Sequence, residues 1–134
     1  MVYILTELVT QQENGAQMLD VNGGLPELDE PRMMEEAVKE LQAVIDLPLQ
    51  IDTSNLQAME RAMRIYNGKP MINSVNGKAE VMEAVFPLAA RYGGVIVALC
   101  LDEEGIPETT EGRIRVARKI IDRARDYGIG REDL

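Results

Sequence analysis

Histidine and tryptophan are absent from this 134-residue sequence, and cysteine and phenylalanine each occur once. Without histidine, the chain has no imidazole for general-base catalysis, for a catalytic triad or for binding zinc. The single cysteine, Cys100, excludes a disulfide bond within the chain and is typical of a reducing compartment, so we expect a cytoplasmic protein. Aromatic residues make up only 4% of the sequence, which argues against a platform for stacking nucleic-acid bases.

Positive charge is also scarce. Lys and Arg total 14 against 23 Asp and Glu, which gives a net charge of −9 and argues against a nucleic-acid partner. No stretch approaches the roughly 18 apolar residues of a membrane span, and the N-terminus lacks the layout of a signal peptide. Hydrophobic residues make up 46% and no linker interrupts the chain, so residues 1–134 are predicted to form one globular domain.

Short apolar runs alternate with helical patterns along the sequence. The runs are Ala16–Asp20, Leu49–Asp52, Pro70–Ser74 and Val95–Leu101. Each is short and mainly apolar, which predicts strands that are buried on both faces of a parallel sheet. A helical pattern over residues 2–14 comes first and another follows each run. The resulting order, αβαβαβαβα, is typical of an α/β fold with right-handed crossovers.

Local signals predict where the helices begin and which faces they bury. The second helix opens at Asp29-Glu30-Pro31, with acidic residues that complement the helix dipole. The third opens with a capping box from Ser54 to Gln57 and stops at Gly68. The last helix begins near Thr109 or Thr110. The residues predicted to face inward, in chain order, are Leu5, Leu8 and Val9; Met34, Val38, Leu41 and Ile45; Leu56, Met59, Met63 and Tyr66; and Ile114, Ala117, Ile121 and Ala124.

Polar side chains gather where the first three runs end. They are Asp20 and Asn22, then Asp52, Thr53 and Asn55, then Asn73, Ser74 and Asn76. The carboxyl ends of parallel strands form the edge where α/β proteins bind ligands. An arc of carboxylates and amides there can read the donors and acceptors of a flat heterocycle. Asp and Asn also suit turns and helix caps, so both interpretations stand for each residue.

Four stretches together resemble the pterin-binding methyltransferase family. They are DVNGG (20–24), LQIDTSN (49–55), KPMINSVNG (69–77) and LDEEGIP (101–107), and the resemblance extends over essentially the whole chain. The family includes the folate domain of cobalamin-dependent methionine synthase and the methyltetrahydrofolate:corrinoid protein methyltransferases. The resemblance implies a (β/α)8 barrel, of which this sequence would supply strands two to five with their flanking helices.

The resemblance also implies a reaction and a set of pterin-binding residues. The family moves a methyl group from methyltetrahydrofolate to a corrinoid (cobalamin) that a partner domain or protein carries. Asp52 would correspond to the family's pterin-reading Asp, and Asn73 to the Asn that closes the next strand. Asp20 and Asn22 would line the same cavity. Ser74, Asn76 and Asn55 are weaker candidates, no catalytic residue is assigned, and no metal is implied in this chain.

Further pterin contacts of the family fall on strands beyond Leu134, so residues 1–134 alone are expected to be inactive. Strands at the edges of such a half-barrel would lack neighbours, and the apolar run Val95–Leu99 favours self-association. We therefore expect a homo-oligomer, in which two copies approximate a closed barrel. The alternatives are a non-catalytic half-barrel fragment that only self-associates and an enzyme similar to dihydropteroate synthase.

Overall fold

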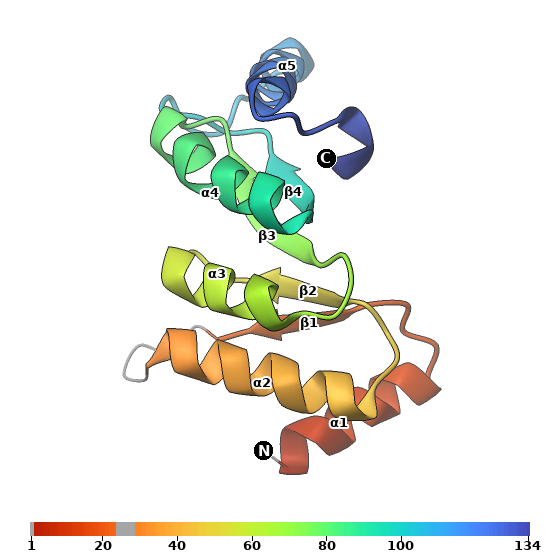
Figure 1. Cartoon of the computed structure of the whole chain (residues 1–134). Helices are drawn as coiled ribbons and strands as arrows, with labels where there is room; N and C mark the ends of the chain where they lie inside the picture. The colour runs from red at the N-terminus through yellow and green to blue at the C-terminus, as the bar shows by residue number, and fades with distance from the viewer. Residues whose placement is uncertain (1, 24–28) are drawn as a thin grey trace. The chain divides into compact units, whose positions relative to one another are not determined.

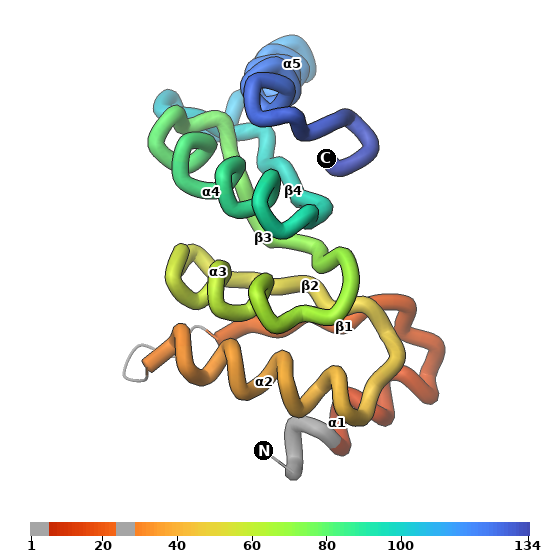
Figure 2. Tube along the Cα trace, viewed as in Figure 1, coloured from red at the N-terminus to blue at the C-terminus, as the bar shows by residue number. Residues whose placement is uncertain are grey.

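The computed structural model describes residues 2–23 and 29–134, with side chains from Thr6 onward (Figure 1). The chain divides into two compact units, unit 1 (Met1–Met71) and unit 2 (Ile72–Leu134). The predicted alternation of helices and strands is confirmed, and Figure 2 follows it along the trace. In the described residues, each unit contains a pair of neighbouring parallel strands with flanking helices. No helix in these ranges is long and apolar enough to cross a membrane.

Unit 1 is built around two short strands. It contains α1 (Val2–Glu13), β1 (Leu19–Asn22), α2 (Glu30–Val44), β2 (Leu49–Asp52) and α3 (Leu56–Ile65). The strands pair in parallel with Leu19 opposite Leu49, and α2 packs against both β1 and α3. β2 has its predicted bounds, but β1 begins at Leu19 instead of Ala16. The Ala16 amide still donates to the Gln11 carbonyl at 3.0 Å, so Ala16 belongs to the turn that ends α1.

Helix α2 confirms its predicted start and buried face. The Asp29 carboxylate accepts a hydrogen bond from the Arg32 amide at 3.3 Å, and Pro31 lies in the first turn. The first helical turn leaves backbone donors without partners. The Asp29 carboxylate satisfies one of them, and Pro31 removes another because proline has no N–H. The residues predicted to face inward, Met34, Val38, Leu41 and Ile45, are all buried.

Helix α3 begins one residue later than predicted. Its cap is Asn55, whose side-chain oxygen accepts from the amides of Gln57 (3.0 Å) and Ala58 (3.1 Å). The capping box predicted from Ser54 is therefore wrong, and Ser54 is exposed. Its buried residues are Ala58, Met59, Ala62 and Met63, whereas Leu56, predicted to face inward, is 41% exposed.

The end of α3 is fixed by side chains and not by glycine. The backbone is extended at Tyr66, so the predicted stop at Gly68 is wrong. The half-buried Tyr66 hydroxyl accepts a hydrogen bond from the Leu49 amide at 3.2 Å. Gln42 of α2 donates to the Ile65 carbonyl at 3.2 Å and accepts from the Asn67 amide. The Gln42 side chain thus supplies one of the carbonyl partners that a glycine cap would provide, and the other two bonds tie Tyr66 to β2 and Asn67 to α2.

Unit 2 repeats the strand–helix pattern. It contains β3 (Met71–Asn76, Met71 itself falling in unit 1), α4 (Ala79–Tyr92), β4 (Val95–Leu99), α5 (Thr110–Asp126) and the 3-10 helix η1 (Arg131–Asp133). Thr109 caps α5 as predicted, accepting from the Gly112 amide at 3.1 Å. The buried face of α5 consists of Gly112, Val116, Ile120 and Ala124. Of the four residues predicted to face inward, only Ala124 is fully buried, and Ile114 is 46% exposed.

Candidate pterin site on strands β1 and β2

The two strands of unit 1 have one apolar and one polar face. Burial alternates along both strands, with Leu19, Val21, Leu49 and Ile51 buried. The expectation that these strands are buried on both faces is therefore wrong. Between the buried residues lie Asp20 and Asn22, which are exposed, and Gln50 and Asp52, which are half-buried. We call these four residues the polar face. A strand's side chains alternate between faces, so all four lie on the side opposite the apolar core.

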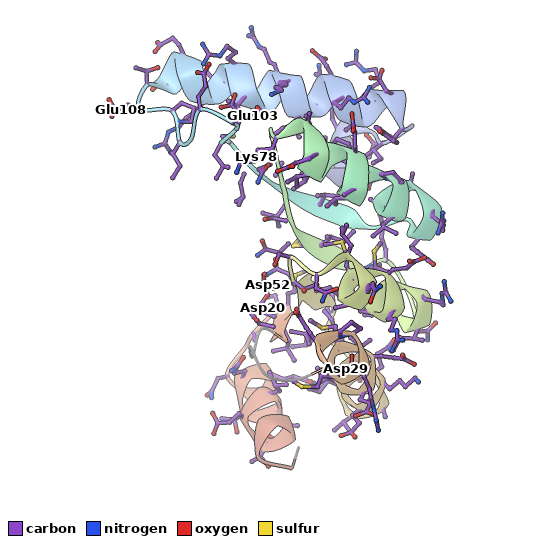
Figure 3. The ribbon with its side chains drawn as sticks, turned by 90° about the vertical axis from the view of Figure 1, so that its left-hand side faces the viewer. Asp20, Asp29, Asp52, Lys78, Glu103 and Glu108 are labelled. Carbon is purple, nitrogen blue, oxygen red and sulfur yellow. The ribbon has the colours of Figure 1, made fainter. Side chains whose placement is uncertain are left out.

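Hydrogen bonds link the polar face across the strand pair. Asn22 lies opposite Asp52, and its Nδ2 donates to Asp52 Oδ2 at 3.1 Å. Asp20 lies opposite Gln50, whose Nε2 donates to Asp20 Oδ1. Figure 3 shows Asp20 and Asp52 close together on the neighbouring strands. The parallel register thus creates two matched amide–carboxylate pairs, one pleat apart.

The polar face keeps acceptor capacity after these bonds are made. Within the described residues, Asp20 Oδ2, Gln50 Oε1 and Asp52 Oδ1 accept no hydrogen bond. The two carboxylates add negative charge. Such a surface complements a ligand edge that carries N–H donors. The described residues contain no group of three His, Cys, Asp or Glu side chains that could hold a metal ion.

The loop after β2 is held by a buried hydroxyl. Thr53 is 7% exposed, and its Oγ1 donates to the Glu30 carboxylate at the start of α2. The same oxygen accepts from the Asn55 amide at 3.0 Å. Thr53 therefore ties the end of β2 to the first turns of α2 and α3, directly beside Asp52. Asn55, a weaker site candidate, uses its side-chain oxygen as the α3 cap.

The candidates of the third run lie in unit 2. Asn73 and Ser74 are half-buried residues inside β3, which continues to Asn76, so Asn73 does not close its strand as the resemblance implied. Asn76 Oδ1 accepts from the Lys78 amide at 3.0 Å, which shapes the turn into α4. Asn76 therefore stabilises the turn before α4 and does not cap the helix, whose N-cap is Lys78 without a side-chain cap bond, and Ser74 lies within β3.

Two features of unit 1 were not identified from the sequence. One is Gln50, although the alternation of Leu49, Gln50, Ile51 and Asp52 places it on the same face as Asp52. The other is a pocket of about 200 Å³ next to β1. Its apolar lining comes from Leu8, Val21, Met33, Met34, Ala37 and Leu41, and its polar lining from Asp20, Asn22, Glu36 and Glu40. The pocket borders the polar face through the two residues that both share, Asp20 and Asn22. Gly24 of the DVNGG stretch lies outside the described residues.

Comparisons with known proteins agree with the resemblance. The chain is 26% identical over 132 residues to the methylcorrinoid:tetrahydrofolate methyltransferase of Eubacterium limosum, covering 95% of this chain and 48% of that protein. It is 28% identical over 116 residues to the methionine synthase of Mycobacterium leprae (strain TN), covering 83% of this chain and 10% of that protein. The chain thus spans about half of the first relative and a small part of the second.

The fold matches a solved barrel enzyme. The 7,8-dihydropteroate synthase of Vibrio fischeri ES114 aligns with a TM-score of 0.70 at 20% identity, over 97% of this chain and 54% of that one. This likeness confirms the expected fold class, an α/β chain corresponding to about half of a barrel. A family model described as pterin binding enzyme matches residues 3–134. The chain therefore belongs to the pterin binding enzyme family.

Proposed function

We propose that this chain is the pterin-binding part of a methyltransferase that exchanges a methyl group between a folate and a corrinoid. The observation that carries the proposal is the polar face, where two carboxylates and two amides are matched across β1 and β2. Membership of the pterin binding enzyme family, with methyltransferase relatives, supports the ligand class. We propose that residues 1–134 act as one functional domain.

The residues have distinct roles in this proposal. The pterin ring carries an amino group and a ring N–H side by side, and a carboxylate accepts from both. Asp52 takes this role, because Asn22 holds its Oδ2 in place while Oδ1 accepts nothing from the described residues. Asp20 lies on the same face of the sheet, two residues before Asn22 on β1. Asn73 contributes an amide that both donates and accepts, and this role rests on the resemblance of the KPMINSVNG stretch. Ser74 is a weaker contributor.

The methyl group is exchanged with a corrinoid that a separate domain or protein carries. The name of the Eubacterium limosum relative makes the methylcorrinoid the donor and tetrahydrofolate the acceptor. We propose the direction from methyltetrahydrofolate to the corrinoid, as in methionine synthase, and both directions are testable. The side chains of this chain bind and orient the pterin. No metal bound to this chain enters the proposal.

Calorimetric titration with methyltetrahydrofolate tests the binding step. We expect Asp52→Ala to lose about 2–4 kcal/mol of binding free energy, since the pterin donors lose a charged acceptor. Asn73→Ala is expected to weaken binding in the same direction. Asp46→Ala is the matched control, because Asp46 is an exposed carboxylate in the loop before β2. Binding that survives Asp52→Ala unchanged contradicts the proposal. Absence of heat at millimolar ligand favours the non-catalytic alternative.

Methyl transfer is measured separately from binding. Cob(I)alamin and methyltetrahydrofolate, and in the reverse direction methylcobalamin and tetrahydrofolate, are followed by the change in corrinoid absorbance. Transfer in either direction supports a methyltransferase. The dihydropteroate synthase alternative shares the fold with this chain, but the sequence relatives favour methyl transfer.

We also propose that copies of the chain associate through open strand edges. Among the described residues, β1 has a neighbouring strand on one side only, and the 200 Å³ pocket lies beside that strand. Exposed edges with apolar surroundings accept further strands. Sedimentation velocity tests this, and a species of twice the chain mass at low micromolar concentration is expected. A monomer under these conditions contradicts the proposal.

A further inference from the structure

Helix α5 concentrates positive charge in a chain whose net charge is −9. Six of the 14 cationic residues of the chain lie on α5, against three acidic residues. The side of the helix away from its buried residues combines apolar and basic side chains at helical spacing, and we call it the α5 stripe: Ile114, Arg118, Ile121 and Arg125. Ile114 is 46% exposed, and Arg118 has no hydrogen-bond or ion-pair partner among the described residues. The α5 stripe is thus an outward surface that offers apolar contact and a free positive charge.

Helix α2 has a surface of the opposite charge. The helix contains four acidic residues against two basic ones. The side of α2 that borders the pocket beside β1, which we call the α2 stripe, consists of Met33, Ala37, Glu40 and Val44. Val44 is 57% exposed, and the exposed Glu40 has no hydrogen-bond or ion-pair partner among the described residues. The α2 stripe therefore combines apolar side chains with a free negative charge.

The two stripes match in spacing when their helices run antiparallel. Successive members are separated by four, three and four residues on both helices, which is the separation that keeps side chains on one face. With Glu40 placed opposite Arg118, each free charge meets its complement. Four residues further, about 6 Å along each helix axis, Val44 comes opposite Ile114, and both are exposed aliphatic side chains. One antiparallel register therefore satisfies a charge pair and an apolar pair together.

The pocket supports the same register on the other side of the charge pair. There, Ala37 comes opposite Ile121. One turn further, Met33 comes opposite Arg125. Ala37 and Met33 are half-buried and line the pocket. A small residue such as alanine lets two helices approach closely, and the long stem of an arginine packs on apolar neighbours. A pocket lined mainly by apolar residues, with carboxylates among the rest, thus fits the isoleucine and arginine of the α5 stripe.

We propose that the α5 stripe of one copy docks on the α2 stripe of a second copy of this chain. Charge argues for this occupant, because copies with a net charge of −9 repel each other in general and these two stripes attract. Every copy carries both stripes, so each copy can give and receive the contact. This contact is separate from association through open strand edges, since all members of both stripes lie on helices. It also does not depend on pterin binding.

Charge reversal tests the proposal by sedimentation velocity of the full chain over a range of micromolar concentrations. Glu40→Arg and Arg118→Glu each place like charges opposite each other, and each is expected to raise the Kd of the contact at least about tenfold. In an equimolar mixture, the two variants can pair with each other without like charges in either contact, so association should return to the wild-type level. Glu13→Arg and Arg131→Glu are the matched controls, because both residues are exposed, lie outside the stripes and change the net charge by the same amounts.

The outcomes separate this contact from association through strand edges. Weaker association of each stripe variant alone, recovery in the mixture and unchanged controls support the proposal, because mixing does not repair a folding defect. Stripe variants that associate as wild type does overturn the proposal and leave the strand-edge contact standing. A loss of association that mixing does not restore overturns the pairing of the two stripes. A wild-type chain that stays monomeric overturns both contacts.

Discussion

Thr53→Val removes one hydroxyl group from beneath the proposed site and keeps the size of the side chain. The hydroxyl donates to the Glu30 carboxylate, and a hydrogen bond to a charged group contributes about 1.5–3 kcal/mol. The same oxygen accepts from the Asn55 amide at 3.0 Å, and losing a neutral bond costs about 0.5–1.5 kcal/mol. Because Thr53 is 7% exposed, water replaces these partners poorly. The expected loss of unfolding free energy is therefore about 2–4 kcal/mol.

Urea denaturation followed by circular dichroism at 222 nm measures this loss. With a slope of about 2 kcal/mol per M, the midpoint should fall by about 1–2 M. Thr53→Ser is the matched control, because it keeps the hydroxyl and deletes one methyl group, at about 0.8 kcal/mol. Equal midpoints for the valine and serine variants would refute the bridging role of the hydroxyl.

The remaining predictions concern unit 2. The amide of Ala79, with the Glu103 backbone and Lys119 Nζ, holds the pKa of the Glu103 carboxyl at about 2, below its usual 4.5. A lowered folded-state pKa adds stability that is present above pH 4.5 and lost as the pH falls toward 2. Glu103→Gln should thus lower the melting temperature at pH 7, and the gap to wild type should close near pH 2; a constant gap would argue against the charge. Gly77→Ala should destabilise by about 1–3 kcal/mol, because its Cβ would lie 2.8 Å from Val116 Cγ1. Unchanged urea midpoints in that variant would show that the contact relaxes at no cost.

The sequence predicted those elements whose local signals coincide. Helix α2 has a capping Asp29, a proline in its first turn and an apolar stripe at helical spacing, and its start and face were both correct. Helix α3 offered two capping residues, Ser54 and Asn55. In the structure the Thr53 hydroxyl accepts from the Asn55 amide, which is a local contact, and donates to Glu30 of α2, which is a tertiary contact. The sequence alone does not show this second bond, which holds the segment before α3 against α2.

The site shows the same division between local and tertiary information. The sequence placed Asp20, Asn22 and Asp52 near strand ends, and the structure puts them on one face of β1 and β2. Gln50 was missed, because a four-residue run with one amide reads as a buried apolar strand. The parallel register, which sets Gln50 opposite Asp20, only follows from the assembled sheet. The buried face of α5 was predicted incorrectly for a similar reason. Ile114 and Val116 are both apolar, and the sequence does not show which of the two faces the core.

The central claim is that the polar face of β1 and β2 binds a pterin. Its most direct test is carbon-detected NMR of the side-chain carboxyl groups during titration with methyltetrahydrofolate. We predict that the Cγ resonances of Asp52 and Asp20 shift in a saturable way, while that of the exposed Asp46 stays in place. A saturable titration that moves other carboxyl groups and leaves Asp52 and Asp20 unchanged would contradict the account.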